Sequence, residues 1–138
     1  MTDHSIDPKL VEGIYPLQDH LGFCVTAWET DFARIELPLS GFLMNRQGIP
    51  HGGVHATLLD TAMGFAGCFT GDPEIRQMAL TLSLTVNYLG IARGERLIAE
   101  GRRTGGGRKT YFAEGQVTDT SGQIVATATG VFKYRPAD

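Results

Sequence analysis

The alternation of apolar and polar residues predicts six strands. A strict period of two runs from residue 78 to residue 89 and predicts a strand with one apolar face. The apolar residues of this run are Met78, Leu80, Leu82, Leu84, Val86 and Tyr88. Other strand-like runs, separated by short turns, cover residues 23–29, 32–37, 95–104, 108–119 and 123–134.

One long run has helical periodicity instead. Its apolar residues recur at spacings of four and three and are Val54, Leu58, Ala62, Phe65 and Phe69. The helix is expected to follow the Gly52-Gly53 pair and to end near residues 70–71. A short helix at residues 8–14, capped by Asp7, and a turn at residues 17–22 are expected before the first strand.

Two strands, one long helix and four further strands predict an α+β fold, in which an antiparallel sheet curls around the helix. The length of 138 residues suits a single domain, residues 1–138. Residues 1–20 are expected to form an N-terminal extension with a short helix. The strand face opposite the apolar one is rich in threonine, which indicates either a subunit contact or an exposed face with high strand propensity.

Asp60 is an acid near the middle of the otherwise apolar helix. Its neighbours on the same helix face are mostly small. They are Gly53, Ala56, Thr57, Met63, Gly64 and Gly67. A carboxylate beside small residues can be approached closely by a ligand or by another chain. The alternative is that the glycines allow tight packing on the sheet and that Asp60 is exposed without a role.

The N-terminus of the same helix predicts a set of hydrogen-bond donors. Gly52 and Gly53 place backbone N–H groups at the positive end of the helix dipole, where they can stabilise an oxyanion. Asp60 can supply a base or a nucleophile. Because Asp60 lies eight residues after Gly52, about 12 Å along the helix, one chain cannot bring both to one reacting carbon. If both serve one reaction, the sequence predicts a symmetric dimer with composite sites.

Composition and charge exclude several classes of function. A net charge of −3 and a pI near 5.8 argue against a general nucleic-acid-binding surface. Neither a signal peptide nor an apolar run long enough for a membrane span is visible. The two cysteines fit a reducing compartment, so a cytoplasmic location is expected.

Other chemistries fit the sequence less well. His51 and His55 have the spacing of zinc ligands, but the Glu of the metalloprotease motif is missing and Asp60 lies on the opposite side of the helix. No metal is therefore expected. The glycines at 105–107 do not form a phosphate-binding loop, because Arg108 interrupts the motif and a strand follows it.

Six residues of the central stretch carry a resemblance to a known family. The pattern N-x-x-G-x-x-H-G-G, followed by an Asp eight residues after the first Gly of the pair, comprises Asn45, Gly48, His51, Gly52, Gly53 and Asp60. It resembles the hotdog-fold acyl-CoA thioesterases of the phenylacetate-degradation (PaaI) type. The resemblance implies a hotdog fold over residues 20–135, a curved antiparallel sheet wrapped around one long central helix.

The resemblance also implies roles for individual residues. Asp60 would be the general base or nucleophile, and the Gly52 amide would polarise the thioester carbonyl. Asn45 would position water or the thioester, and His51 would hold the loop and the carbonyl end. Thr81 would orient the water, although it lies opposite Leu80 and Leu82 and can reach the site only at a subunit boundary or a β-bulge.

The substrate implied by the resemblance is an aryl- or medium-chain acyl-CoA. Arg108 and Lys109 would bind its coenzyme A phosphates together with Gly53, unless the two basic residues form only a solvated turn. Coenzyme A enters as part of the substrate and no separate cofactor is expected. The expected assembly is a homodimer with composite active sites, extended to a homotetramer. A non-catalytic acyl-CoA-binding or sensing module is the alternative function, and a dehydratase on the same fold is a further one.

Overall fold

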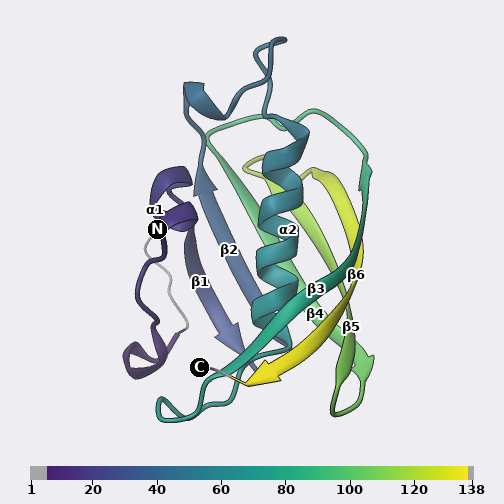
Figure 1. The fold of residues 1–138 in the computed structure, drawn as a ribbon. Helices are drawn as coiled ribbons and strands as arrows, with labels where there is room; N and C mark the ends of the chain where they lie inside the picture. Colours follow the sequence, from purple (N-terminus) through teal and green to yellow (C-terminus); the bar gives the residue numbers. More distant parts are fainter. Residues whose placement is uncertain (1–5, 137–138) are drawn as a thin grey trace.

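The computed structural model describes residues 6–136 and contains one long helix in the hollow of a curved sheet (Figure 1). The helical elements are η1 (Pro8–Leu10), α1 (Pro16–Leu21), η2 (Gly41–Leu43) and α2 (Gly52–Ala66). The strands are β1 (Cys24–Glu29), β2 (Phe32–Pro38), β3 (Gln77–Tyr88), β4 (Arg96–Gly106), β5 (Thr110–Asp119) and β6 (Ile124–Pro136). The predicted α+β arrangement is confirmed.

The strands form one six-stranded sheet in the order β1-β2-β4-β5-β6-β3, and all neighbours are antiparallel. All six predicted strands are present, with ends that differ by a few residues. The hairpin predicted between the first two strands turns at Asp31, which has a left-handed φ of 62°. β3 lies at one edge of the sheet, so one side of this twelve-residue strand has no strand partner among the described residues.

Helix α2 buries a stripe against the concave face of the sheet. The stripe consists of His55, Leu58, Leu59, Ala62, Met63 and Ala66. Val54 and Phe65 are only half-buried, so the predicted apolar face is displaced around the helix by about one position. None of the helices described, this one included, is both long and apolar enough to span a bilayer.

Helix α2 ends at Ala66, which corrects the predicted end near residues 70–71. Aromatic side chains from three strands donate hydrogen bonds to the carbonyl groups of its C-terminal end. The Tyr111 hydroxyl donates to Met63 and Gly64 at 3.0 Å each. Trp28 Nε1 donates to Phe65 O at 2.8 Å, and the Tyr134 hydroxyl donates to Gly67 O at 2.7 Å. Tertiary contacts therefore satisfy the orphan carbonyls that a following turn of helix would otherwise satisfy.

Gly101 of β4 allows the closest approach of the helix to the sheet. A Cβ atom at this position would lie 2.6 Å from the backbone carbon of Ala62 and 2.7 Å from the backbone nitrogen of Met63. Backbone atoms cannot move aside as the end of a flexible side chain can. Any side chain here must push α2 away from the core.

Replacing Gly101 with alanine is therefore expected to lower the free energy of unfolding by about 1–3 kcal/mol, the usual range for overpacking. Gly105→Ala is the matched control, because a Cβ there, on the same strand, would meet nothing within 4 Å. Urea denaturation of both variants measures the difference. Equal stability of the two variants would show that the close approach is not rigid.

The N-terminal segment differs from its prediction. Asp7 does cap a helical turn, since its carboxylate accepts from the Lys9 N–H at 3.0 Å. However, η1 covers three residues, and the predicted helix over residues 8–14 is wrong. The second helical element begins instead at Pro16, whose ring suits the first position of a helix. An ion pair of 3.3 Å between Glu12 and Arg76 ties the segment to the loop before β3.

A β-bulge between Thr81 and Ser83 changes which face of β3 looks toward the helix. Before the bulge, Ala79 packs on the core while Leu80 is 49% exposed. After it, Leu84 and Val86 pack on the core. The prediction of one continuous apolar face from Met78 to Tyr88 is therefore wrong, although the strand itself is present. Thr81 therefore lies on the side of β3 that faces α2 and remains exposed there.

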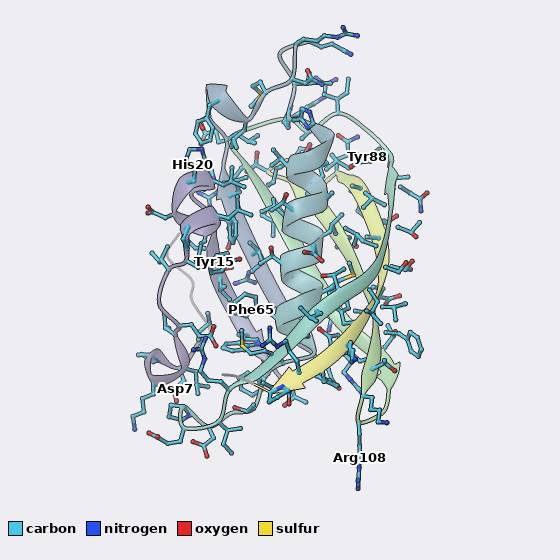
Figure 2. The ribbon with its side chains drawn as sticks, viewed as in Figure 1. Asp7, Tyr15, His20, Phe65, Tyr88 and Arg108 are labelled. Atoms are coloured by element: carbon cyan, nitrogen blue, oxygen red, sulfur yellow. The ribbon has the colours of Figure 1, made fainter. Side chains whose placement is uncertain are left out.

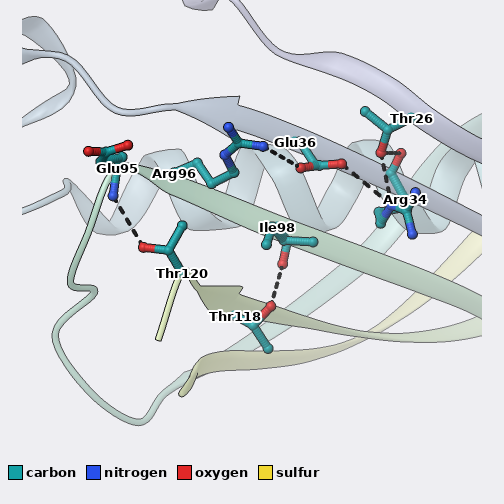
Figure 3. A network of polar contacts seen from close by, with 8 residues as sticks. All are labelled: Thr26, Arg34, Glu36, Glu95, Arg96, Ile98, Thr118 and Thr120. Carbon is teal, nitrogen blue, oxygen red and sulfur yellow. Dashed lines mark hydrogen bonds and ion pairs between the residues drawn. The ribbon is translucent and has the colours of Figure 1, made fainter. Parts of the chain in front are cut away.

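The convex face of the sheet has two different halves. On β2 and β4, Arg34 and Arg96 form ion pairs with Glu36 at 3.5 and 3.2 Å, and Arg34 Nε also donates to the Thr26 hydroxyl (Figure 3). On β5 and β6, Phe112 is 49% exposed and Thr129 is exposed beside it. Glu114 is exposed directly opposite Thr129, so the uncharged character that the sequence indicated for a subunit contact is interrupted in this half as well.

Candidate active site

The N-terminus of α2 is held by side chains on both sides. His51 is the N-cap residue, and its Nδ1 accepts from the Gly53 N–H at 2.8 Å. The hydroxyl of Tyr88 donates to Gly52 O at 2.6 Å. These two bonds fix both ends of the peptide unit between Gly52 and Gly53, and so they hold the first turn of the helix in place.

The sequence predicted free N–H groups at both Gly52 and Gly53, and the structure leaves only one of them free. The Gly53 N–H is taken by His51, whereas the Gly52 N–H has no acceptor within the described part of the chain. The carbonyl of His51, which belongs to the same peptide unit as the Gly52 N–H, accepts from Val54 at 2.9 Å. The Gly52 N–H is thus a fixed donor at the positive end of the helix dipole.

Asn45 organises the loop that leads into α2. Its Oδ1 accepts from the Gln47 N–H at 2.8 Å and from the Ile49 N–H at 3.4 Å. Its backbone N–H donates to Ile49 O at 2.8 Å, and an isolated β-bridge joins Met44 to Pro50. The carboxamide oxygen of Asn45 is thereby used within the loop, which leaves its NH₂ group as the part that can meet a ligand.

Asp60 and Thr81 come together across 21 positions of sequence. The Thr81 hydroxyl donates to Asp60 Oδ1 at 2.6 Å. This contact exists because the bulge turns Thr81 toward the helix. The sequence predicted that Thr81 could reach the site only at a subunit boundary or at a β-bulge. The hydroxyl hydrogen of Thr81 is therefore directed at the carboxylate. The bond orients the carboxylate and leaves Oδ2 of Asp60 for water or substrate.

Asp60 lies in the wall of a cleft of about 210 Å³ between α2, the start of β3 and the N-terminal segment. Its other lining residues include Tyr15, Trp28, Gly64, Phe65, Cys68 and Ala79. Most of these are apolar or small, whereas Glu12, Thr61, Gln77 and Thr81 add polar groups and a second carboxylate to the lining. An apolar wall with a small number of polar groups is typical of a ligand site.

Tyr15 reaches this cleft from outside the sheet. Burial raises the pKa of Tyr15 above its ordinary value, a hydrogen bond with the Thr61 side chain lowers it, and the charge of Asp60 raises it. The phenol therefore stays protonated at neutral pH beside the carboxylate. No pattern in the sequence indicated a role for Tyr15, because this residue lies in the weakly patterned N-terminal extension.

The two predicted reacting groups lie on one uninterrupted helix and are separated as the sequence implied. Gly52 is the first residue of α2, and Asp60 follows eight residues later. At 1.5 Å per residue they are about 12 Å apart along the axis. Between them the helix presents Ala56 and Thr57, both half-exposed. One chain therefore carries the two predicted reacting groups at opposite ends of a strip of small residues.

His55 is a buried polar residue that sequence reasoning considered only as a metal ligand. It is 4% exposed, and its Nδ1 finds no hydrogen-bond partner among the described residues. Burial lowers the pKa of His55, so the imidazole is neutral at neutral pH. Residues 6–136 contain no group of three His, Cys, Asp or Glu side chains that could hold a metal ion.

Arg108 and Lys109 occupy the exposed turn between β4 and β5. Arg108 projects from the end of the molecule opposite Tyr88, and Tyr88 marks the N-terminus of α2 through its bond to Gly52 (Figure 2). Within one chain the basic turn is therefore far from the free amide. Their contact with coenzyme A stays a prediction, as does that of Gly53.

Both the sequence and the fold of this chain are similar to those of known thioesterases. A sequence profile of the thioesterase superfamily matches residues 47–126. The chain is 28% identical over 130 residues to the Escherichia coli protein named medium/long-chain acyl-CoA thioesterase YigI, a match that covers 85% of this chain and 84% of that one. The solved structure of BH2602 from Bacillus halodurans, which contains CoA, is 30% identical with a TM-score of 0.70 and covers 86% of this chain and 75% of that one.

The predicted hotdog fold is confirmed by a further solved structure. The PaaI protein of Escherichia coli, from the phenylacetic acid degradation operon, matches with a TM-score of 0.76 at 19% identity and covers 88% of this chain and 86% of that one. At this identity the likeness concerns the fold. The fold and family expected from the motif at residues 45–60 are therefore both supported.

Proposed function

This chain belongs to the thioesterase superfamily, and we propose that it hydrolyses an aryl- or medium-chain acyl-CoA to the free acid and coenzyme A. The observation that carries the proposal is the Asp60 carboxylate, held by Thr81 at 2.6 Å in the wall of a largely apolar cleft. The name of the YigI relative and the CoA in the BH2602 structure support the choice of an acyl-CoA. Apart from the acyl-CoA, the proposed reaction uses only water.

Asp60 can act in two ways. As a general base it takes a proton from water, the resulting hydroxide attacks the thioester carbonyl carbon, and the C–S bond breaks to release the thiolate. As a nucleophile it attacks the same carbon, expels the thiolate and forms a mixed anhydride that water then hydrolyses. In both cases the Gly52 N–H stabilises the oxyanion of the tetrahedral intermediate. A thiolate leaves readily, so a dedicated general acid is not needed.

The reaction requires a second copy of the chain. Gly52 and Asp60 each lie four residues from Ala56, so a two-fold axis near Ala56 that relates antiparallel α2 helices places Gly52 of one subunit beside Asp60 of the other. The half-exposed, small residues between them allow this approach. The free edge of β3 supports the same arrangement, because a long edge strand with Leu80 and Leu82 49% and 56% exposed is normally covered.

The same two-fold relation brings the turn with Arg108 and Lys109 toward the partner's site. Arg108 projects from the end of the molecule at which the C-terminal end of α2 lies (Figure 2), and in an antiparallel pair this end is on the side of the partner's helix N-terminus. Arg108 and Lys109 are therefore proposed to bind the coenzyme A phosphates of the partner's site. The part of the convex face around Phe112, Glu114 and Thr129 is proposed as the contact that extends the dimer to a tetramer.

The experiment is a thiol-release assay with the purified protein over aliphatic and aromatic acyl-CoAs. Hydrolysis of aryl- or medium-chain thioesters is expected, with little activity toward the corresponding oxygen esters. Calorimetry on the same acyl-CoAs distinguishes the alternative function. Binding without thiol release across the whole panel would replace the enzyme with an acyl-CoA-binding module. The free thiols of Cys24 and Cys68 suit the cytoplasmic location that belongs to this proposal.

A further inference from the structure

Two cavities share one wall beside the C-terminal half of α2. The first is the Asp60 cleft, and the second is a cavity of about 380 Å³ between the N-terminal segment and β1. The residues that line both are Glu12, Tyr15, Trp28 and Phe65. The second cavity is otherwise lined mainly by apolar residues, among them Val11, Ile14, Phe23 and Val25. Tyr15 and Phe65 lie on the side of α2 that faces the N-terminal segment (Figure 2).

Within this wall, Trp28 and Phe65 are packed more firmly than Tyr15. Trp28 and Phe65 belong to the body of the protein, with Trp28 Nε1 bonded to Phe65 O at 2.8 Å and the two rings 5.1 Å apart, edge to face. Tyr15 is 38% exposed and makes an edge contact with Phe23 at 6.0 Å. Its backbone carbonyl accepts from the Asp19 N–H at 2.9 Å, so its main chain is anchored at the start of α1. The Tyr15 ring is thus a partly exposed partition, held by the contact with Phe23 and by the hydrogen bond of its hydroxyl with the Thr61 side chain.

The sizes of the two cavities indicate what each can hold. A closed apolar cavity of about 150 Å³ binds benzene, so the Asp60 cleft has room for one aromatic ring or a short alkyl chain. A longer acyl chain that starts at Asp60 has to pass the wall. Beyond the wall it would meet an apolar cavity larger than the first.

We propose that the second cavity is an extension of the acyl-binding site and that Tyr15 closes it off, so that Tyr15 sets the longest acyl group that the enzyme accepts. This inference rests on the proposed function. The ligand of the second cavity is the distal part of an alkyl chain, since its lining offers apolar contacts along most of its length.

Two substitutions of Tyr15 change the partition in opposite directions. Tyr15→Ala opens the wall, and kcat/KM is expected to rise for acyl chains longer than the wild-type optimum, by about fourfold for each methylene group that enters the second cavity. Tyr15→Trp enlarges the partition, and the longest acyl-CoA that the wild type accepts is expected to be lost first. Straight-chain acyl-CoAs from acetyl to palmitoyl measure both profiles.

Two controls separate the ring from other effects. Tyr15→Phe keeps the ring and removes the hydroxyl, so its dependence on chain length should match that of the wild type. Leu17→Ala removes another exposed apolar side chain of the same region, one that lines neither cavity, and should leave the activity unchanged. If Tyr15→Ala does not fold, the Tyr15→Trp profile alone decides.

Binding supplies a readout that does not depend on turnover. Trp28 is the only tryptophan of the chain and lines both cavities, so its fluorescence reports a ligand at the wall. Titration with fatty acids of increasing length is expected to show tighter binding of long acids to Tyr15→Ala than to the wild type. If hydrolysis and binding depend on acyl-chain length in both Tyr15 variants as they do in the wild type, the proposed role of Tyr15 is wrong and the proposed function stands. Absence of thiol release from every acyl-CoA by every variant would overturn the proposed function together with the role of Tyr15.

Discussion

Replacing Asp60 with asparagine is expected to lower kcat for acyl-CoA hydrolysis by about 10²–10⁴-fold, the contribution usual for a positioned base. Asparagine has nearly the same shape as aspartate, and its side-chain oxygen can still accept from the Thr81 hydroxyl that now bonds Oδ1 at 2.6 Å. What the variant loses is the ability to take a proton from water or to attack the thioester. Thiol release under saturating substrate measures the effect.

Asp119→Asn is the matched control, because Asp119 is a second, almost fully buried carboxylate with no part in the cleft. It accepts hydrogen bonds from Ser121, Arg93 and Gln123, and these bonds, with that from the Ser121 side chain foremost, lower the pKa of Asp119 below its ordinary value. The folded state prefers the charged form, so this stabilisation is present above the unfolded pKa and is lost as the pH falls through the lower folded value. The control should therefore lose thermal stability and keep kcat, whereas an Asp60→Asn variant with wild-type turnover would remove Asp60 from the mechanism.

The Gly52 amide can be deleted without adding a charge. Gly52→Pro removes the N–H at the first position of α2, where proline is well tolerated, and the preceding His51 already has the extended conformation that proline requires. The loss of one oxyanion donor is expected to lower kcat by about 10²–10³-fold. Gly52→Ala keeps the N–H while introducing the same Cβ, which would lie 3.3 Å from the Tyr88 ring. The activity of the alanine variant should remain much closer to that of the wild type.

Mixing the two inactive variants tests whether the sites are composite. In a hybrid dimer of Asp60→Asn and Gly52→Pro, one site combines the intact Asp60 of one subunit with the intact Gly52 of the other, and the second site carries both defects. Random exchange makes about half of the dimers hybrids, so about a quarter of the wild-type activity should return. A site formed within one chain would show no recovery after co-expression. Such a result would rule out the two-fold arrangement and leave the fold unaffected.

Much of the fold could be predicted because its signals lie in contiguous residues. The period of two in β3 and the helical period in α2 need only local sequence, and so does the order of elements that indicates an α+β fold. The central motif from Asn45 to Asp60 is local as well, and it places the amide and the carboxylate on one helix. Their separation of eight residues follows from helix geometry alone, and so does the prediction that a reaction using both groups needs a second chain.

Other features depend on contacts between distant residues. The end of α2 is decided by Tyr111 and Tyr134, whose hydroxyls bond carbonyl groups 47, 48 and 67 positions away. The face of β3 that meets Asp60 is decided by the bulge after Thr81. The alternation in the sequence cannot reveal this bulge, because apolar and polar residues continue to alternate strictly across it. Sequence reasoning could state that Thr81 needed such a bulge, and only the sheet register shows that it is there.

By itself, the sequence determined the elements, their order, the family motif and the distance between Gly52 and Asp60, since each of these is written within one continuous stretch. Only the tertiary structure decided that Thr81 bonds Asp60, that His51 occupies the Gly53 amide, and that Tyr15 and Trp28 form the wall of the cleft. The physical reason is that hydrogen-bond direction and cavity shape depend on strand register and on how the N-terminal segment packs across β1 and α2. These are properties of the folded chain as a whole.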